Sequence, residues 1–311
     1  MKKYFRELSV AGALGILLIV LAILAPSFYS PQPLLSLAAR ASVSLVVALG
    51  MALVIIAREI DISVGSMFAV CSVCAGLFAA MHWPLALVIV ASIVVGAVFG
   101  AFNGALVAGL GLPSIVVTLA TMVTWQEGLR WLRQGEFVNL PEGVQWFGLS
   151  QRAGQWALVL GALALLVVLA FIMKHFSAGR FIYAVGSDAE VARLSGIPPK
   201  LTTFLIFVFM GALVGLAAMM NVVQSPQVDP QSGNGLELKV IAAVVVGGVA
   251  ISGGRGNLWG VFAGLLLLAC ISPALTHLHI EAYWEKAIQG VIILLAVVAE
   301  GWRSRKALDH G

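Results

Sequence analysis

The sequence predicts an all-α membrane protein, a polytopic bundle of about ten transmembrane helices with both termini in the cytoplasm. Of its 311 residues, 61% are hydrophobic and only 10% are charged, whereas a soluble domain carries about 25% charged residues. Its mean hydropathy is +1.03. A water-soluble core could not bury this much apolar surface, so the solvent around the chain must be a lipid bilayer.

Apolar runs of about 17 to 25 residues follow one another along the chain, and this is the length that a helix needs to cross a bilayer. The runs lie near 9–27, 36–57, 64–81, 84–109, 114–133, 154–173, 203–223, 238–252, 258–275 and 283–300. Two of them, 64–81 and 238–252, are short or interrupted by glycine. The first follows basic residues without a convincing small-residue cleavage site, so we expect an uncleaved first span.

The distribution of Lys and Arg predicts the orientation. With both termini inside, twelve of the 18 basic residues fall in cytoplasmic segments and six in outer segments. Such an excess on the cytoplasmic side is typical of membrane proteins. We therefore expect one transmembrane domain over residues 1–311, with the polar segment at about 174–203 in the cytoplasm.

Several functional classes are excluded. The net charge is +4, but the basic residues are scattered between apolar runs and form no stripe for nucleic acid. The chain has no phosphate-binding loop of the type GxxxxGK[ST], so we expect no ATP hydrolysis, no catalytic residues and no cofactor of its own. Cys71, Cys74 and Cys270 lie inside apolar runs without metal spacing, so we expect no metal site.

The segment at 174–203 carries the signals of a short helix. Ser187 or Asp188 can cap its N-terminus, and Gly196 before two prolines can end it. Its small, moderately apolar centre could occupy a groove of another protein, and the alternative is a solvated connector. The residues of this expected docking helix are Ser187, Asp188, Glu190, Ala192, Arg193, Ser195 and Gly196.

Polar residues inside the apolar runs point to the transported solute. Residues 58–66 place three charges and two hydroxyls between two runs. They form either a tight cytoplasmic turn or a broken helix that lines a cavity. Uncharged hydroxyls and amides suit a neutral polyhydroxylated solute, although threonines can equally bond one helix to another. The candidate residues of a translocation pathway are Asp61, Ser63, Ser66, Asn103, Thr118 and Thr121.

Glycines recur every four residues in two runs, at positions 96, 100 and 104 and at positions 256, 260 and 264. Small residues at this spacing let helix backbones approach closely in lipid. The pattern predicts close packing, either within one bundle or between subunits.

Five segments resemble the permease family of bacterial sugar ABC importers, which includes the ribose, arabinose, xylose, rhamnose and autoinducer-2 permeases. They are Ile60–Ser66; Asn103–Gly104 with Pro113–Thr121; Gly179–Arg180 with Tyr183–Gly186; Ala192–Ile197; and Gly247–Gly248 with Ser252–Gly256. They occur in the family's order between about 45 and 260. The sequence departs from the family at Arg58 and Glu59, where many members have two glycines. The segments 140–143 and 235–239 look more like the rhamnose and autoinducer-2 branch.

The resemblance implies a division of labour in the bacterial inner membrane. A second permease copy or a paralogue would complete the pathway, and a periplasmic sugar-binding protein would deliver a monosaccharide to the outer loops, chiefly 134–153 and 224–237. The sugar would be rhamnose-like, a pentose or autoinducer-2-like. A cytoplasmic ATPase subunit would use the ATP and grip the helix at 187–197. The alternative is a self-contained secondary transporter or channel for a small polar solute, for which Asp61 is the one candidate ion-coupling carboxylate.

Overall fold

The computed structural model describes residues 5–24 and 26–277, with isolated positions between 281 and 298. Its elements in chain order are α1 (Phe5–Leu24), the 3-10 turn η1 (Pro26–Tyr29), α2 (Pro31–Ile56), α3 (Val64–Ala80), α4 (Leu85–Gly104), the π-helical turn η2 (Ala105–Gly109), α5 (Ser114–Arg133), β1 (Val138–Asn139), the 3-10 turn η3 (Gln145–Gly148), α6 (Gln151–His175), α7 (Ser177–Ser187), α8 (Ala189–Leu194), α9 (Pro199–Val222), β2 (Gln227–Val228), α10 (Leu236–Val246) and α11 (Leu258–His277).

The all-α polytopic bundle predicted from the sequence is confirmed. Nine of the ten predicted spans coincide with α1 to α6 and α9 to α11. The tenth, at 283–300, lies outside the continuously described residues, as do the two termini whose cytoplasmic location was predicted. Within the described ranges, five helices are long and apolar enough to cross a membrane: α2, α4 with η2, α6, α9 and α11.

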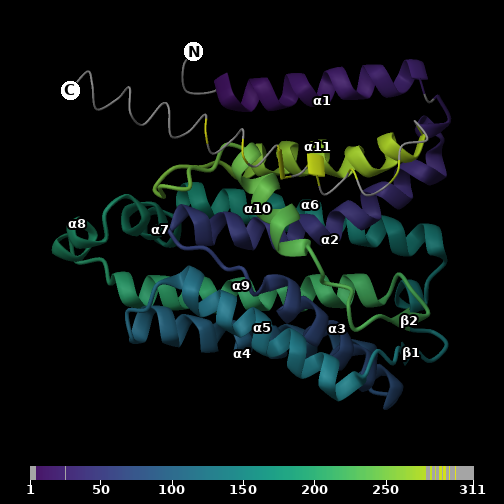
Figure 1. Ribbon diagram of the computed structural model, residues 1–311, viewed down its shortest axis with the longest axis horizontal. Coiled ribbons are helices and arrows are strands. Elements are labelled where there is room, and N and C mark those ends of the chain that lie inside the picture. The colour runs from purple at the N-terminus through teal and green to yellow at the C-terminus, as the bar shows by residue number, and fades with distance from the viewer. Residues whose placement is uncertain are drawn as a thin grey trace.

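The long helices run side by side along the longest axis of the molecule (Figure 1). At one end, here called the α8 end, lie α7 and α8, and at the other, the β end, β1 pairs with β2 (Figure 1). The pairing is antiparallel and joins Val138 to Val228 and Asn139 to Gln227. The two predicted outer loops, 134–153 and 224–237, are therefore held together at the β end.

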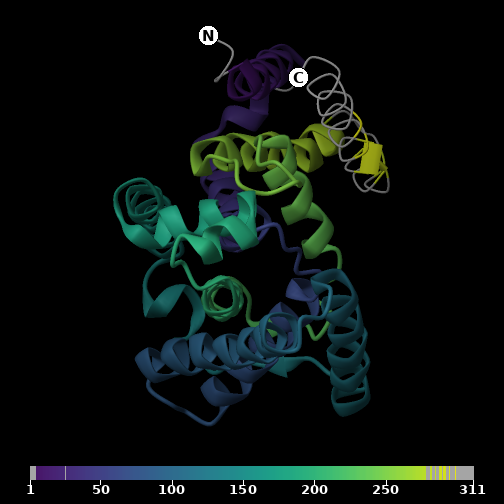
Figure 2. The same cartoon turned by 90° about the vertical axis from the view of Figure 1, so that its left-hand side faces the viewer.

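Helices α2 and α9 form the centre of the core. Every residue of α2 from Ala41 to Ile56 is buried. Figure 2, which looks at the α8 end, shows α9 end-on between α4 and α5 on one side and α10 and α11 on the other. The burial of α2 from Ala41 to Ile56 explains why that stretch is almost wholly apolar, as helices surrounded by protein usually are.

Close backbone contacts account for the glycine repeats. A methyl group added at Gly96 would overlap the carbonyl oxygen of Gly211, and one at Gly100 would overlap that of Phe207, both on α9. One at Gly264 on α11 would overlap the carbonyl oxygen of Ala243 on α10. At these positions the small residues serve packing within the chain, the first of the two alternatives.

Helices α3 and α10 are short because the chain leaves helical geometry within the bundle, before α3 and after α10. Residues 57–63 are non-helical, and α3 starts only at Val64. Helix α10 ends at Val246 instead of near 252, because Gly248, just after the cap Gly247, takes a left-handed backbone conformation that ends a helix. Residues 247–257 form a loop at this point.

The length and apolarity of α6 give a direct test of the topology. Because α6 crosses the bilayer, its two ends must lie in different compartments. A reporter fused after His175 is expected to read cytoplasmic, and one fused after Gly143, in the loop before α6, periplasmic. The measurement is the activity ratio of a paired phosphatase and fluorescent-protein reporter. The same compartment for both fusions would show that α6 does not cross the bilayer, and the reverse result would contradict the orientation.

Candidate functional site

The non-helical segment between α2 and α3 is held by hydroxyl groups of α5. The backbone N–H of Ile60 donates to Ser114 Oγ at 3.2 Å, and that of Ile62 donates to Thr118 Oγ1 at 3.1 Å. Thr118 Oγ1 itself lies 2.8 Å from the carbonyl oxygen of Ser114, to which it donates. Within a bilayer, backbone groups that leave a helix need such partners, because water cannot reach them.

Asp61 lies at the centre of a buried polar cluster. Its Oδ1 accepts hydrogen bonds from the backbone N–H of Ser63 at 2.9 Å and from Ser63 Oγ at 2.6 Å. Asn103 Nδ2 of α4 donates to the same Ser63 Oγ at 2.8 Å. Asp61, Ser63, Asn103 and Thr118 are all 0% exposed. Four of the six predicted pathway residues are thus brought together, and they join the helix break to α4 and α5.

The other two predicted pathway residues, Ser66 and Thr121, lie nearby. Ser66 Oγ donates to the carbonyl oxygen of Ser63 at 2.8 Å, and Thr121 Oγ1 donates to that of Thr118 at 3.3 Å. Each side chain therefore bonds the backbone carbonyl oxygen of the residue three positions before it. Their role in a pathway stays a prediction, but Ser66 also reaches the groove described next.

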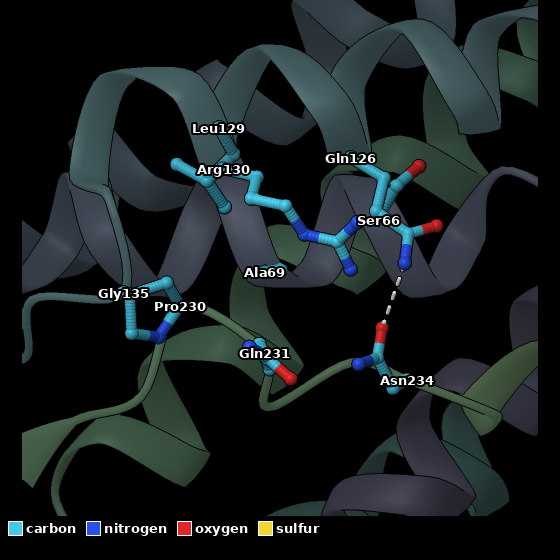
Figure 3. Close-up of a pocket in the computed structure, with 9 residues that line it drawn as sticks. All are labelled: Ser66, Ala69, Gln126, Leu129, Arg130, Gly135, Pro230, Gln231 and Asn234. Carbon is cyan, nitrogen blue, oxygen red and sulfur yellow. Dashed lines mark hydrogen bonds between the residues drawn. The ribbon is translucent and has the colours of Figure 1, made fainter.

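A small groove opens between α3, α5 and the segment before α10 (Figure 3). Gln126 Nε2 donates to Asn234 Oδ1 at 3.2 Å across it, and the side chain of Arg130 runs along α5 toward Gln126 (Figure 3). The lining consists of polar side chains with a few small or apolar ones: Ser66, Ala69, Gln126, Leu129, Arg130, Gly135, Pro230, Gln231 and Asn234. Such a lining offers several uncharged hydrogen-bonding groups to a solute.

Sequence reasoning missed most of this groove. Gln231 and Asn234 fall in a predicted outer loop, and Arg130 reads as a topology signal at the end of a span. One local signal was available. Gln126 and Arg130 stand four residues apart in the predicted span 114–133, which places them on one face of a helix.

The exposed surface of α5 in its second half is mixed, because charged and polar residues lie among the exposed Val123, Trp131 and Leu132. Glu127 and Arg130 form an ion pair of 2.8 Å and both side chains are about half exposed, and Thr124 is exposed on the same helix. By contrast, α4 exposes Val90, Val94 and Val98. Charges are costly against lipid, so the Glu127–Arg130 pair suits a watery pathway or another subunit better than acyl chains.

The helix expected at 187–197 is present as α8, with the predicted start and stop. Asp188 is the cap, because its Oδ1 accepts from the N–H groups of Glu190 at 2.9 Å and Val191 at 3.0 Å. Ser187, the other candidate cap, is the last residue of α7. At the other end, Gly196 has a φ of +82°, and the N–H of Ile197 donates to the carbonyl oxygen of Ala192 at 3.0 Å.

The surface of α8 differs from the prediction at one residue. Ala192 is only 3% exposed and packs toward the rest of the chain, so it does not belong to a docking surface. The exposed apolar residues are Val191 at 58% and Leu194 at 76%. Beside them Arg193 Nε donates to Glu190 Oε2 at 3.0 Å, and this hydrogen bond raises the pKa of the Arg193 guanidinium. Ser195 caps the C-terminal end of the helix.

A family model and individual relatives of the chain are all described as transport permeases. The family model described as "Branched-chain amino acid transport system / permease component" matches residues 34–297. The chain is 34% identical over 306 residues to the autoinducer 2 import system permease protein LsrC of an Enterobacter species, covering 98% of this chain and 89% of that protein. It is 30% identical over 308 residues to the ribose import permease protein RbsC of Escherichia coli, covering 96% and 95%. No solved structure matches the chain.

Substitutions at Asp61 test the role of the buried cluster. Asp61→Ala removes the acceptor of two buried hydrogen bonds from Ser63, and an unsatisfied buried donor costs about 1–3 kcal/mol. We expect a lower unfolding temperature in detergent, measured by fluorescence-detected size exclusion after heating. Asp61→Asn keeps Oδ1 and should lower the unfolding temperature less. Thr124→Ala, at an exposed hydroxyl that bonds only within its own helix, is the control. Equal stability of Asp61→Ala and the wild type would contradict the assignment.

Proposed function

The chain belongs to the permease family of bacterial sugar ABC importers, and we propose that it carries a monosaccharide across the bacterial inner membrane, driven by ATP hydrolysis in a separate subunit. It is a multi-pass transport component and not an enzyme. In the proposal the chain has no cofactor of its own, and the partner subunit uses the ATP. The sugar would be rhamnose-like, a pentose or autoinducer-2-like, in line with relatives whose names refer to autoinducer 2 and ribose.

Helix α8 is the observation that carries the ATP-driven proposal. It is a capped helix at one end of the bundle, and it exposes Val191 and Leu194 side by side with the Glu190–Arg193 ion pair. Exposed apolar residues on a short helix suit a groove in a partner protein. A cytoplasmic ATPase subunit is the partner that the family implies. Helix α8 lies in the segment 174–203, which the sequence predicts to be cytoplasmic.

The groove and the exposed Glu127–Arg130 pair of α5 support a sugar pathway. A neutral sugar needs many modest hydrogen bonds, which Ser66, Gln126, Gln231 and Asn234 could supply. In our proposal the exposed Glu127–Arg130 pair of α5 meets a second copy of the chain or a paralogue across the pathway. A periplasmic sugar-binding protein would release the sugar at the β end, where β1 and β2 hold the two outer loops together.

One observation favours the second candidate, a self-contained secondary transporter. Among the described residues, Asp61 Oδ2 is buried and has no hydrogen-bond partner, and ion-coupled transporters use buried carboxylates of this kind. Reconstituted vesicles separate the two candidates. Uptake that requires ATP, the ATPase subunit and the binding protein supports the importer. Uptake by the permease alone under an ion gradient would overturn it, and a panel of radiolabelled sugars in the same assay identifies the solute.

Charge on α8 tests the docking surface. Leu194→Asp leaves the Asp188 cap intact but places a charge where an apolar contact is proposed, so co-purification of the ATPase subunit should fall about tenfold or more. Gly196→Val should act similarly, because valine is strained at a positive φ. Ser177→Asp adds the same charge at the start of α7 and serves as the control. Normal ATPase binding in both α8 variants would leave α8 as a solvated connector.

Removing hydrogen-bonding groups tests the groove. Gln126→Leu keeps the size of the side chain but removes its amide, so sugar uptake should fall by about fivefold to tenfold while ATPase binding is unchanged. The initial rate of radiolabelled sugar uptake is the measurement. Thr276→Val, at an exposed hydroxyl of α11 that bonds only within its own helix, should transport normally. A wild-type rate for Gln126→Leu would remove the groove from the pathway.

A further inference from the structure

Three backbone segments meet at the α8 end of the bundle without side chains between them. They are the end of α2 at Ile56, the end of α7 at Gly186 and the loop between α10 and α11 at Gly254. The N–H of Gly254 donates to the carbonyl oxygen of Ile56 at 2.8 Å. A methyl group added at Gly186 would overlap that same oxygen and lie 2.8 Å from the Gly254 nitrogen.

The neighbouring residues extend this contact, which we call the glycine junction (Ile56, Gly186, Gly253 and Gly254). A methyl group at Gly253 would lie 2.5 Å from the carbonyl oxygen of Gly186 and 2.7 Å from Arg58 Cβ. Tyr183 Oη, one turn earlier in α7, donates to the carbonyl oxygen of Gly256 at 2.9 Å. The junction is thus a backbone-to-backbone contact with one side-chain hydrogen bond beside it.

Each segment of the junction leads to a different functional part. Gly186 is followed by Ser187 and then by Asp188, the cap of α8. Ile56 is followed by the non-helical segment that holds the buried Asp61 and leads into α3. The Gly254 loop is continuous with α10. The junction therefore ties α8 to both short helices of the bundle.

The two short helices also touch each other next to the groove. A methyl group at Gly65 on α3 would lie 2.6 Å from the carbonyl oxygen of Gly233, two residues before the cap of α10. The adjacent residues Ser66 and Asn234 both line the groove. A continuous chain of contacts therefore runs from α8, through the glycine junction, to the start of α3 and the groove.

We propose that Gly186 and Gly254 are positioning residues for transport, because their contact with the Ile56 carbonyl passes the movement of α8 to α3 and α10. The proposal rests on the proposed function, since the movement comes from the ATPase subunit. Closely packed interiors transmit displacement with little loss. A wedge in the junction would let α7 and α8 move while α2 and the segment after it stay in place.

The test is Gly186→Ala in the complete complex with the ATPase subunit and the binding protein in vesicles. Gly186 lies inside α7, where alanine fits the helical backbone, so only the added methyl group matters. The ATPase subunit should stay bound and its basal hydrolysis should persist. Sugar uptake, and the stimulation of hydrolysis by the binding protein, should both fall about tenfold. Gly161→Ala in α6, where an added methyl group meets nothing within 4 Å, is the matched control.

Tyr183→Phe is the second variant, and it tests the role of the glycine junction if Gly186→Ala does not fold. It removes only the hydroxyl that bonds Gly256, so the ratio of uptake to hydrolysis should fall about threefold with assembly unchanged. A wild-type ratio in every variant that folds would overturn the proposal. So would equal losses of ATPase binding and uptake, which indicate a merely structural contact. Failure of the proposed function itself shows separately, as no ATP-driven uptake by the wild-type complex.

Discussion

A chain that leaves helical geometry between two buried helices exposes backbone donors and acceptors that need new partners, and this constraint governs the packing between α2 and α3. The chain leaves helical geometry after Ile56 and resumes it at Val64. Ser114 and Thr118 of α5 receive the hydrogen bonds of the intervening N–H groups, and Ser63 and Asn103 surround Asp61. Helices α4 and α5 must therefore lie where their polar side chains meet the break, and the groove beside α3 follows from that placement.

The glycine contacts make this arrangement possible in apolar surroundings. Helices in lipid gain little from burying apolar area against one another, so they depend on close packing and hydrogen bonds. The contact of Gly96 and Gly100 with the α9 backbone fixes α4 against the core. The glycine junction does the same at the α8 end, where side chains of any size would separate α7 from α2.

The sequence predicted the features that depend on short stretches of chain. The spans follow from runs of apolar residues, and the start and stop of α8 follow from Asp188 and Gly196, each of which acts within four residues of itself. The unusual polarity of 58–66 pointed to a broken helix as one of two possibilities. Helix α7 was not predicted as a separate element, because its 11 residues lie in a polar stretch with a glycine near each end.

The features that were missed depend on contacts between distant residues. Gln126 and Asn234 are 108 positions apart, and Ile56 and Gly254 are also far apart in the sequence. The burial of Ala192 depends on how α8 lies against its neighbours, which the pattern of the helix alone does not specify.

One further consequence follows from the difference between the two halves of α5. Its first half carries Ser114 and Thr118, which hold a segment more than fifty positions away in the chain, so these hydroxyls are tied to folding. Its second half carries Gln126 and Arg130, which line the groove, and there Gln126 meets the distant Asn234 only through a hydrogen bond between two side chains, which leaves both backbones free of it. Selection can therefore alter the second half while the first stays constant. A single helix divided in this way lets a lineage of transporters acquire new cargo without having to rebuild the scaffold.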